Sequence, residues 1–329
     1  MGRNGGRQAA GRATDSFSFL ECTLDPMTEG AVAPGSERTA EPAMTIRFWG
    51  TRGSIPSPGP ATARFGGNTS CLEVQYGEGK RIIFDAGSGM RPLGHEIMAS
   101  GPPPTGTVFL THFHWDHIQG FPFFAPLYHE RSNLQIVGPM QQSIDIRSLF
   151  AGQMGPVYFP VPFSALSANI GFHHLNDGTW EGDGFEVSAL RVRHPSFTVG
   201  YRIEIGGRVA IYVPDNELGG GSYDVGAGWE ERFVEFIRGA DVLIHDAMYT
   251  DEEYTRREGW GHSTFAQALE LAARAEVGRL FLFHHSPERT DEELSAIVEE
   301  LVETVERRGY RLGVEAADEG EAFVMEEKP

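Results

Sequence analysis

The sequence contains little cysteine, no long apolar run and few basic residues compared with acidic ones. Only two of its 329 residues are cysteine, and Cys22 lies in a polar stretch while Cys71 lies in an apolar one, so no disulfide framework is suggested. No stretch approaches the roughly 20 apolar residues of a membrane span. The N-terminal residues also lack the apolar segment of a signal peptide. We therefore expect a protein of the reducing cytoplasm.

The chain is strongly acidic, with 27 Lys and Arg against 46 Asp and Glu and a formal net charge of −19. Such a charge repels polyanions at long range, and a large nucleic acid would need a local basic patch to overcome it. The sequence contains no run rich in Lys and Arg. We therefore do not expect a large nucleic acid as a partner, and we interpret the acidity as a solvated surface.

The composition changes near residue 44. Hydrophobic residues make up 40% of the chain, which is enough for a substantial core. Residues 1–43, in contrast, are rich in Gly, Ala, Ser, Thr, Glu and Arg and show no sustained apolar period. We expect them to form a disordered N-terminal extension, and residues 44–329 to form one folded domain.

Short β-rich runs, separated by Gly, Pro or charged turns, dominate the chain after residue 44. One set spans residues 45–50, 71–76, 81–87 and 107–113, and a second set spans residues 185–192, 198–205 and 208–215. The last two runs are joined by Gly206 and Gly207, which predict a tight hairpin. We expect each set to form one β-sheet.

Helical periodicity is clearest near the C-terminus. Apolar Phe265, Leu269 and Ala272 follow the cap residues Ser263 and Thr264. A second helix is predicted by Leu294, Ile297, Val298, Leu301, Val302 and Val305, and the run 279–283 between the helices is typical of a buried strand. Two strand-rich halves with helices in each predict an α/β protein, a four-layer αβ/βα sandwich.

The densest group of metal-binding residue types lies at the end of an apolar run. His112, His114, Asp116 and His117 directly follow residues 107–111. Residues two apart in an extended chain point the same way, so His112 and His114 can bind one metal ion, while Asp116 and His117 can face a second one after the chain turns. Such side chains at the end of a buried strand need partners, because burying them alone costs free energy. We therefore favour a metal site over a loop of surface histidines.

The spacing of these residues resembles the HxHxDH signature of the metallo-β-lactamase superfamily, which implies the sandwich fold and further metal ligands in a fixed order. His194 matches the third histidine of the first metal, and Asp215 matches the bridging carboxylate. His284 matches the last ligand, in preference to His285, because the ligand of the family closely follows the apolar strand. Asp85 matches a buried aspartate that orients the metal-binding loop. The resemblance covers about residue 45 to the end and identifies residues 44–329 as a hydrolase domain.

The implied ligands are imidazole and carboxylate groups without cysteine, which suits Zn²⁺ and also Mn²⁺ or Fe²⁺. We expect Zn²⁺, and two ions per chain, because the ligands exceed what one tetrahedral centre can use. Two such ions would hold a hydroxide between them and stabilise a tetrahedral or phosphoryl transition state, so the expected reaction is hydrolysis. A single histidine after a strand is more often a structural residue, so this prediction depends on the whole set in its order.

A second motif concerns the substrate. Residues 260–264, WGHST, resemble the histidine motif of the ribonuclease Z-like and cyclic-phosphodiester branches of the superfamily, in which a histidine that is not a ligand approaches the scissile phosphate. The resemblance gives His262 this role, as an aid to the leaving group. Asp246 would hold its second ring nitrogen, and Asp116 completes the expected catalytic set. The alternative for His262 is a helix-start residue that bonds its own backbone.

The expected substrate is a small phosphodiester, in particular a 3′,5′-cyclic nucleotide. The segments TIRFWGTRGSIP and GGNTSCLEV resemble small metal-dependent hydrolases whose relatives include cyclic-nucleotide phosphodiesterases. Ribonuclease Z is the rival, but it carries a long tRNA-gripping arm between the third histidine and the bridging aspartate, whereas His194 and Asp215 are only 21 positions apart here. A lactonase or thioesterase would leave the WGHST motif unexplained, and a non-catalytic metal-binding sensor would not need a proton donor.

The sequence also allows predictions for Arg52, for an aromatic segment and for the remaining histidines. Arg52 can contact a phosphate or form a surface salt bridge, and the aromatic segment 121–130 can form a lid over the site or a dimer contact. The resemblance also implies a homodimer. The remaining histidines are expected to be structural, namely His95, His129, His173, His174 and His245.

Overall fold

The computed structural model describes residues 42–101 and 105–327. The expected N-terminal extension therefore falls outside the described residues, except for its last two. Pro42 and Ala43 belong to the first strand, where Pro42 pairs with Glu326 and the Ala43 side chain is buried. Within the described chain, regular structure thus begins two residues before Met44.

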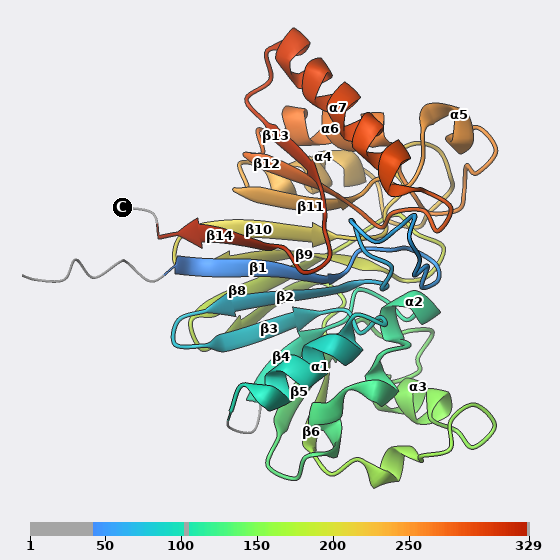
Figure 1. Cartoon of the computed structure of the whole chain (residues 1–329), viewed down its shortest axis with the longest axis vertical. Helices are drawn as coiled ribbons and strands as arrows, with labels where there is room; N and C mark the ends of the chain where they lie inside the picture. Colours follow the sequence, from blue (N-terminus) through green and yellow to red (C-terminus); the bar gives the residue numbers. More distant parts are fainter. Residues whose placement is uncertain (1–41, 102–104, 328–329) are drawn as a thin grey trace, which may run out of the picture. The chain divides into compact units, whose positions relative to one another are not determined.

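The first sheet contains, among the described residues, seven strands in the order β14-β1-β2-β3-β4-β5-β6 (Figure 1). Their bounds are β1 (Pro42–Gly50), β2 (Cys71–Tyr76), β3 (Lys80–Phe84), β4 (Thr105–Phe109), β5 (Asn133–Gly138), β6 (Asn169–His174) and β14 (Ala322–Glu326). Pairing is antiparallel from β14 to β3 and parallel from β3 to β6. The last strand of the chain therefore lies beside the first.

The second sheet has seven strands in the part of the chain that the structure describes, in the order β13-β12-β11-β10-β9-β8-β7. Their bounds are β7 (Gly178–Gly182), β8 (Phe185–Arg191), β9 (Val199–Ile205), β10 (Arg208–Val213), β11 (Val242–Asp246), β12 (Arg279–Phe283) and β13 (Gly313–Ala316). Pairing is antiparallel from β7 to β10 and parallel from β10 to β13. Gly206 and Gly207 close the β9–β10 hairpin at φ values of 56° and 73°, as their sequence predicts.

Helices cover the outer face of each sheet (Figure 1). The first sheet carries α1 (Met90–Ala99), α2 (Trp115–Ile118) and α3 (Ile146–Gln153), together with the short 3-10 helices η1 (Phe121–Phe123), η2 (Ala125–Tyr128) and η3 (Phe163–Ala165). The second sheet carries α4 (Trp229–Ile237), α6 (Phe265–Arg274) and α7 (Asp291–Arg308), and α5 (Asp251–Tyr254) precedes α6. No helix in residues 42–101 and 105–327 is long and apolar enough to cross a membrane.

Alternating side chains divide the core into three apolar layers. In β3, Ile82 and Phe84 lie between the two sheets, whereas Ile83 packs against the helices of the first sheet. In β12, Phe281 lies between the sheets and Leu280 packs against the helices of the second sheet. Because successive residues of a strand point to opposite faces, such strands are buried on both sides. The order helix, sheet, sheet, helix is the predicted four-layer αβ/βα sandwich.

The two helices predicted near the C-terminus are present. The side chain of Thr264 caps α6 in a capping box with Gln267, and Thr290 caps α7 in the same way. Gly309 ends α7 in the left-handed conformation. Val302, which the periodicity placed on the apolar face of α7, is instead 38% exposed. The buried face of this helix is therefore narrower than the sequence pattern indicates.

Candidate functional site

The motif around His112 connects β4 to the short helix α2. The end of β4 is buried at Val108 and Phe109, and His112 and His114 precede α2, with His114 on extended backbone. Asp116 and His117 belong to α2 itself. Because the chain changes here from extended to helical, the side chains of Asp116 and His117 point in a different direction from those of His112 and His114.

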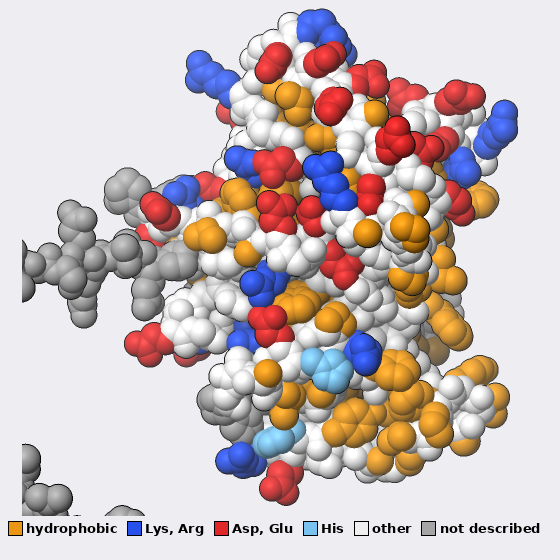
Figure 2. Space-filling model, viewed as in Figure 1, with side chains coloured by type: hydrophobic (Ala, Val, Ile, Leu, Met, Phe, Trp, Pro, Cys, Tyr) orange, Lys and Arg blue, Asp and Glu red, His pale blue; other side chains and the backbone are white. Residues whose placement is uncertain are grey.

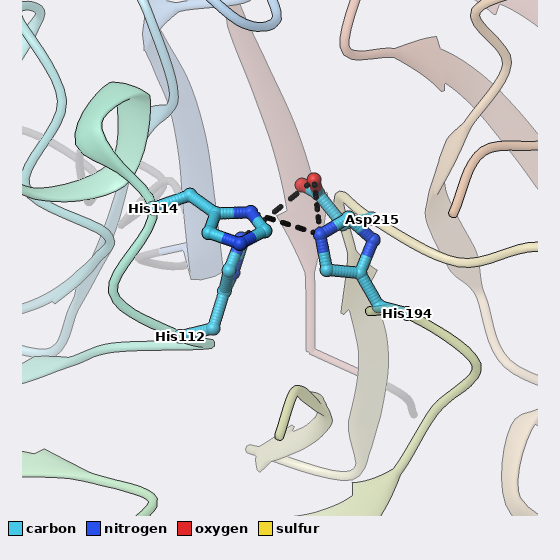
Figure 3. A group of neighbouring side chains, drawn as sticks. All are labelled: His112, His114, His194 and Asp215. Carbon is cyan, nitrogen blue, oxygen red and sulfur yellow. Dashed lines mark hydrogen bonds and ion pairs between the residues drawn. The ribbon is translucent and has the colours of Figure 1, made fainter. Parts of the chain in front are cut away.

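Four side chains that could hold one metal ion converge from three segments of the chain (Figure 3). They are His112, His114, His194 and Asp215, and their ligand atoms lie within 4.8 Å of one another. Nε2 of His194 lies 3.0 Å from Nδ1 of His114 and 3.6 Å from Oδ2 of Asp215. Nε2 of His112 lies 3.8 Å from the same carboxylate oxygen. We call these four residues the first metal group.

A second metal group consists of Asp116, His117 and His284. Nε2 of His284 lies 3.1 Å from Oδ2 of Asp116, and Nε2 of His117 lies 3.4 Å from it. Both nitrogens also face Oδ1 of Asp215, at 3.0 Å from His117 and 3.4 Å from His284. Asp215 therefore directs one oxygen toward each group, as a carboxylate shared by two ions would.

Several buried atoms in these groups make no hydrogen bond to any described residue. One is Nδ1 of His284, on the part of the ring that approaches Gly53. The other three are Nε2 of His112, Nε2 of His117 and Oδ1 of Asp215, which lie close together. Burying such atoms without partners costs free energy, and a cation between them would satisfy the nitrogen lone pairs and the carboxylate oxygen together. The donors are imidazole nitrogens and carboxylate oxygens, which suit divalent ions such as Zn²⁺, Mn²⁺ and Fe²⁺. The residues therefore fit divalent metal ions.

The pKa values of two histidines and one carboxylate agree with this fit. Burial lowers the pKa of His112 well below its usual value and the pKa of His194 to about 3, so both imidazoles are neutral and keep a lone pair. Burial would lower the pKa of His117 too, but Asp215, Asp116 and Asp85 raise it well above its usual value, a rise that a cation at the site would oppose. Burial alone would raise the pKa of Asp215, but His284, His117 and His112 lower it well below its usual value. Its low pKa favours an ionised carboxylate between the two groups.

Asp85 orients the second metal group without belonging to it. This buried carboxylate accepts the Nδ1–H of His117 at 2.8 Å through Oδ2 and the backbone N–H of Thr111 at 2.8 Å through Oδ1. The hydroxyl of Tyr212 also donates to Oδ2, at 3.0 Å. With Nδ1 bound to Asp85, Nε2 is the nitrogen of His117 that would offer a lone pair to a cation, and it faces Asp116 and Asp215.

Arg52 anchors a loop under the second metal group and is buried. The side chain is fully buried and donates to the carbonyl oxygens of Gly66 (2.8 Å), Ser286 (3.0 Å) and Arg289 (2.8 Å). It is therefore not free for a phosphate. The expected salt bridge is present, with Nη2 of Arg52 3.9 Å from Oδ1 of Asp291, but the arginine is buried and does not lie on the surface. A separate contact in this loop is made by the backbone N–H of Ser54.

That N–H of Ser54 donates to Oδ2 of Asp116 at 2.7 Å, so the loop helps to hold a residue of the second metal group. The intervening Gly53 lies against the ring of His284, where a Cβ would be 2.4 Å from ring atoms. Glycine is therefore required at this close approach. The segment TRGS thus has a positioning role that its sequence alone did not reveal.

His262 lies beside both metal groups and is held by Asp246. Its Nδ1–H donates to Oδ2 of Asp246 at 2.8 Å, and its ring centroid lies 4.9 Å from that of His284. Burial would lower the pKa of His262, but Asp246, Asp215 and Asp116 raise it to about 9. With Asp215 and His284 it also forms a third group that could hold a metal ion. The Nδ1–H of His262 thus bonds Asp246 and not the backbone of its own segment, so the alternative for this residue is wrong.

The other histidines lie outside these groups. His285 points away from the site and donates Nε2–H to the carbonyl of Ala317 at 2.9 Å, which agrees with the choice of His284 as the ligand. His245 bonds the carbonyl of its neighbour Asp246 through Nδ1 at 2.7 Å. The remaining members of this set are His95, His129, His173 and His174, none of which occurs in a metal-binding group of the described residues.

The aromatic segment 121–130 is mainly part of the core. Phe121, Phe124 and Leu127 are buried in the apolar layer between the first sheet and its helices, whereas Phe123 and Tyr128 are exposed. Figure 2 shows hydrophobic side chains gathered on the face over α2 and α3. Only the exposed members of the segment are available for a surface contact, and the expected homodimer stays a prediction.

Glu217 is a buried residue near the site that the sequence did not predict. Glu217 lies two positions after Asp215, is fully buried, and accepts hydrogen bonds from the backbone N–H groups of Gly259 and Gly261, both at 2.8 Å. The only signal in the sequence is that an acidic side chain follows a buried strand closely. A glutamate in that position is ordinarily solvated, so the pattern gave no reason to select it.

Residues 80–285 match the beta-lactamase superfamily domain. The chain therefore belongs to the metallo-β-lactamase superfamily, in its ribonuclease Z-like branch, and is a metal-dependent hydrolase. Among its relatives, a ribonuclease Z of Archaeoglobus fulgidus is 30% identical over 304 aligned positions, covering 79% of this chain and 93% of that protein.

Solved structures share the fold. The metallo-beta-lactamase fold protein YhfI from Bacillus subtilis superposes with a TM-score of 0.61 at 19% identity, covering 85% of this chain and 98% of that one. Unliganded yeast PDE1 gives a TM-score of 0.61 at 14% identity, covering 87% and 100% of the two chains. At these identities the similarity establishes the common fold and leaves the substrate to be argued from the site.

Proposed function

We propose that this chain is a phosphodiesterase that uses two divalent metal ions, with Zn²⁺ as the expected ion and Mn²⁺ or Fe²⁺ also suited to the ligands. His112, His114 and His194 would hold one ion, Asp116, His117 and His284 the other, and Asp215 would bridge them. The proposal depends chiefly on one observation, the hydrogen bond from Nδ1 of His262 to the buried carboxylate of Asp246 beside these groups.

Hydrolysis of a phosphodiester has two chemical requirements at this site. When bound, the ions supply an activated water and neutralise negative charge on the phosphoryl group. The leaving oxygen needs a proton, because an alkoxide is a poor leaving group. Asp246 occupies Nδ1 of His262 and leaves Nε2 as the nitrogen that can carry this proton to the substrate. The pKa of His262, which the neighbouring carboxylates raise, would be raised less with cations bound beside it, and this would favour release of the proton from Nε2.

The pair of His262 and Asp246 also separates the alternatives. Acyl transfer at two metal ions does not require a proton donor in this place, so a lactonase or thioesterase would leave the pair without a role. A non-catalytic metal sensor would not need it either. These considerations support a phosphodiester as the substrate and turnover as the function.

A compact phosphodiester, in particular a 3′,5′-cyclic nucleotide, suits the chain itself. Between His194 and Asp215 there is only the β9–β10 hairpin, whose strands are paired within the second sheet, so no long arm is inserted there. The net charge of −19 disfavours a large polyanion. A cyclic phosphodiester brings one negative charge, which the metal ions can neutralise.

Processing of RNA is the second candidate, and the relatives favour it. The protein from Archaeoglobus fulgidus that is 30% identical to this chain is named ribonuclease Z, and the match covers 93% of its length. The same metal groups and the same histidine would serve a phosphodiester in RNA. The two candidates therefore differ in how the substrate is held, and share the chemistry of the cleavage.

A substrate panel distinguishes these possibilities. Zn²⁺-loaded and Mn²⁺-loaded protein would be incubated with cyclic purine and pyrimidine nucleotides, a precursor tRNA, a lactone and a thioester, and kcat/KM would be compared. We expect the highest value for a cyclic nucleotide. Faster cleavage of the precursor tRNA would establish the second candidate, and activity confined to the lactone or thioester would refute the phosphodiesterase proposal. The His262→Ala variant serves as the control in each assay.

A further inference from the structure

We infer that Glu217 is a positioning residue that fixes both His194 and His262 by holding the loop of residues 259–261. Its link to catalysis rests on the proposed phosphodiesterase function. Its link to the metal group through His194 is independent of the substrate and can be tested without turnover.

Glu217 is a buried carboxylate in which both oxygens are fully occupied. Oε1 accepts hydrogen bonds from the hydroxyl of Tyr254 at 2.6 Å and from the N–H of Gly259 at 2.8 Å. Oε2 accepts from the N–H of Gly261 at 2.8 Å and from the hydroxyl of Tyr223. Hydrogen bonds to a charged acceptor are stronger than those between neutral groups, and a buried donor without its acceptor is costly. Glu217 therefore fixes the backbone of this loop at two points.

Gly261 connects Glu217 to the first metal group. Its N–H donates to Glu217, and its carbonyl accepts the Nδ1–H of His194 at 3.0 Å. This second bond keeps the hydrogen on Nδ1, so the lone pair of His194 is on Nε2, which can accept from Nδ1 of His114 at 3.0 Å and faces Asp215. Gly261 has a φ of +91°, and a Cβ here would lie 2.3 Å from Nδ1 of His194. The loop thus passes directly against the ring that it orients.

The same loop leads into His262. Because His262 is bonded to Gly261 along the chain, the position of Gly261 governs whether Nδ1 of His262 reaches Asp246 at 2.8 Å. Glu217 is itself attached to the strand end that carries His194, since its backbone N–H donates to the carbonyl of Arg193 at 2.8 Å. One carboxylate therefore joins a metal-binding histidine and the proposed proton donor in a single hydrogen-bonded unit.

Three variants of the full chain separate this role from general stability. Glu217→Gln keeps the size of the side chain but places an NH₂ group against one of the two backbone N–H donors, so donor faces donor. Glu258→Gln makes the same chemical change on an exposed side chain next to the loop and is the matched control. A Tyr223→Phe and Tyr254→Phe double variant removes the two hydroxyl donors and leaves the carboxylate in place.

The first readout is the tautomer of His194, observed by long-range ¹H–¹⁵N NMR of the metal-free protein. We expect wild type and Glu258→Gln to carry the hydrogen on Nδ1 and Glu217→Gln to show a large share of the Nε2–H form. The second readout is Zn²⁺ affinity, measured against a competing chelator. In Glu217→Gln the affinity of the first metal group should fall about 10–100-fold, the usual effect of a lost supporting contact, and that of the second metal group should change much less.

Catalysis provides the third readout. In Glu217→Gln we expect kcat to fall more than KM changes, because His262 and His194 are displaced while the substrate surface is retained. If Glu217→Gln does not fold, the double tyrosine variant, for which we expect smaller changes in the same direction, provides the test.

Two results would overturn the inference. One is a lower melting temperature with an unchanged His194 tautomer and unchanged Zn²⁺ affinities, and the other is equal weakening of both metal groups, since both would indicate a merely structural residue. Absence of phosphodiester hydrolysis in wild type, with the tautomer of His194 still dependent on Glu217, would instead refute the proposed function and support the role of Glu217.

Discussion

Replacing His262 with alanine tests the proton-donor role directly. The substitution removes an imidazole that donates to Asp246, but it removes none of the residues of the first and second metal groups. Asp246 keeps the backbone N–H of Asn216 at 3.1 Å. We therefore expect both ions to remain bound. A general acid contributes about 10²–10⁴-fold to turnover, which corresponds to about 2.7–5.5 kcal/mol of activation free energy at ~1.36 kcal/mol per tenfold.

The size of the loss should depend on the leaving group. A nitrophenolate leaves without a proton, so nitrophenyl phosphodiesters should be slowed much less than alkyl phosphodiesters. The lost hydrogen bond to a carboxylate should also destabilise the fold by about 1.5–3 kcal/mol, so turnover must be measured well below the melting temperature. Replacement of the exposed His95 by alanine is the control. Equal slowing of both substrate types, or loss of metal ions from the variant, would refute the proton-donor role.

Three further predictions concern the support of the site. Asp85→Asn should lower metal affinity about 10–100-fold, because Asp85 accepts the Nδ1–H of His117; a chelator competition assay measures this, and an unchanged affinity would contradict the role of Asp85. Arg52→Met should lower the free energy of unfolding by about 2 kcal/mol or more, because it leaves the carbonyl oxygens of Gly66 and Arg289 without a donor and leaves that of Ser286 with only the N–H of Arg289. Urea denaturation should detect this, and a loss below about 1 kcal/mol would contradict it. Removing the metal ions with a chelator should lower the melting temperature in calorimetry, since an ion present at 100 times its Kd stabilises the folded state by about 2.7 kcal/mol. Equal melting temperatures with and without chelator would show that no ion binds the folded chain.

The parts of the fold that the sequence predicted have strong local patterns. After an initial arginine, strands β10 and β12 are continuous apolar runs, strands β3 and β4 end in the buried apolar residues 82–84 and 108–109, and the β9–β10 hairpin has two glycines at its turn. Other elements lack such patterns. Helix α1 contains Pro92 and Gly94, which weaken its helical signal. Strand β6 is largely half-exposed at the edge of the first sheet and alternates poorly.

The residues of the site also fall into two sets, those that the sequence identifies and those that it does not. Metal-binding residues follow strand ends, and their types and order identify them before any distance is known. The supporting residues depend on contacts between distant segments. Arg52 meets carbonyl groups of residues 286 and 289, and Glu217 meets N–H groups of residues 259 and 261. No local pattern predicts such partners, because only the folded chain brings them together.

The residues of the two metal groups follow strands of both sheets, and this has a consequence for the biosynthesis of the protein. His112 and His117 follow β4 of the first sheet, whereas Asp215 and His284 follow β10 and β12 of the second. During translation the chain leaves the ribosome from its N-terminus, so the earlier donors emerge long before His284. A nascent chain that ends before β12 lacks part of the second metal group. Binding of both proposed ions should therefore follow release of the chain and the docking of its two halves, and a molecule that holds both ions would be one whose assembly is complete.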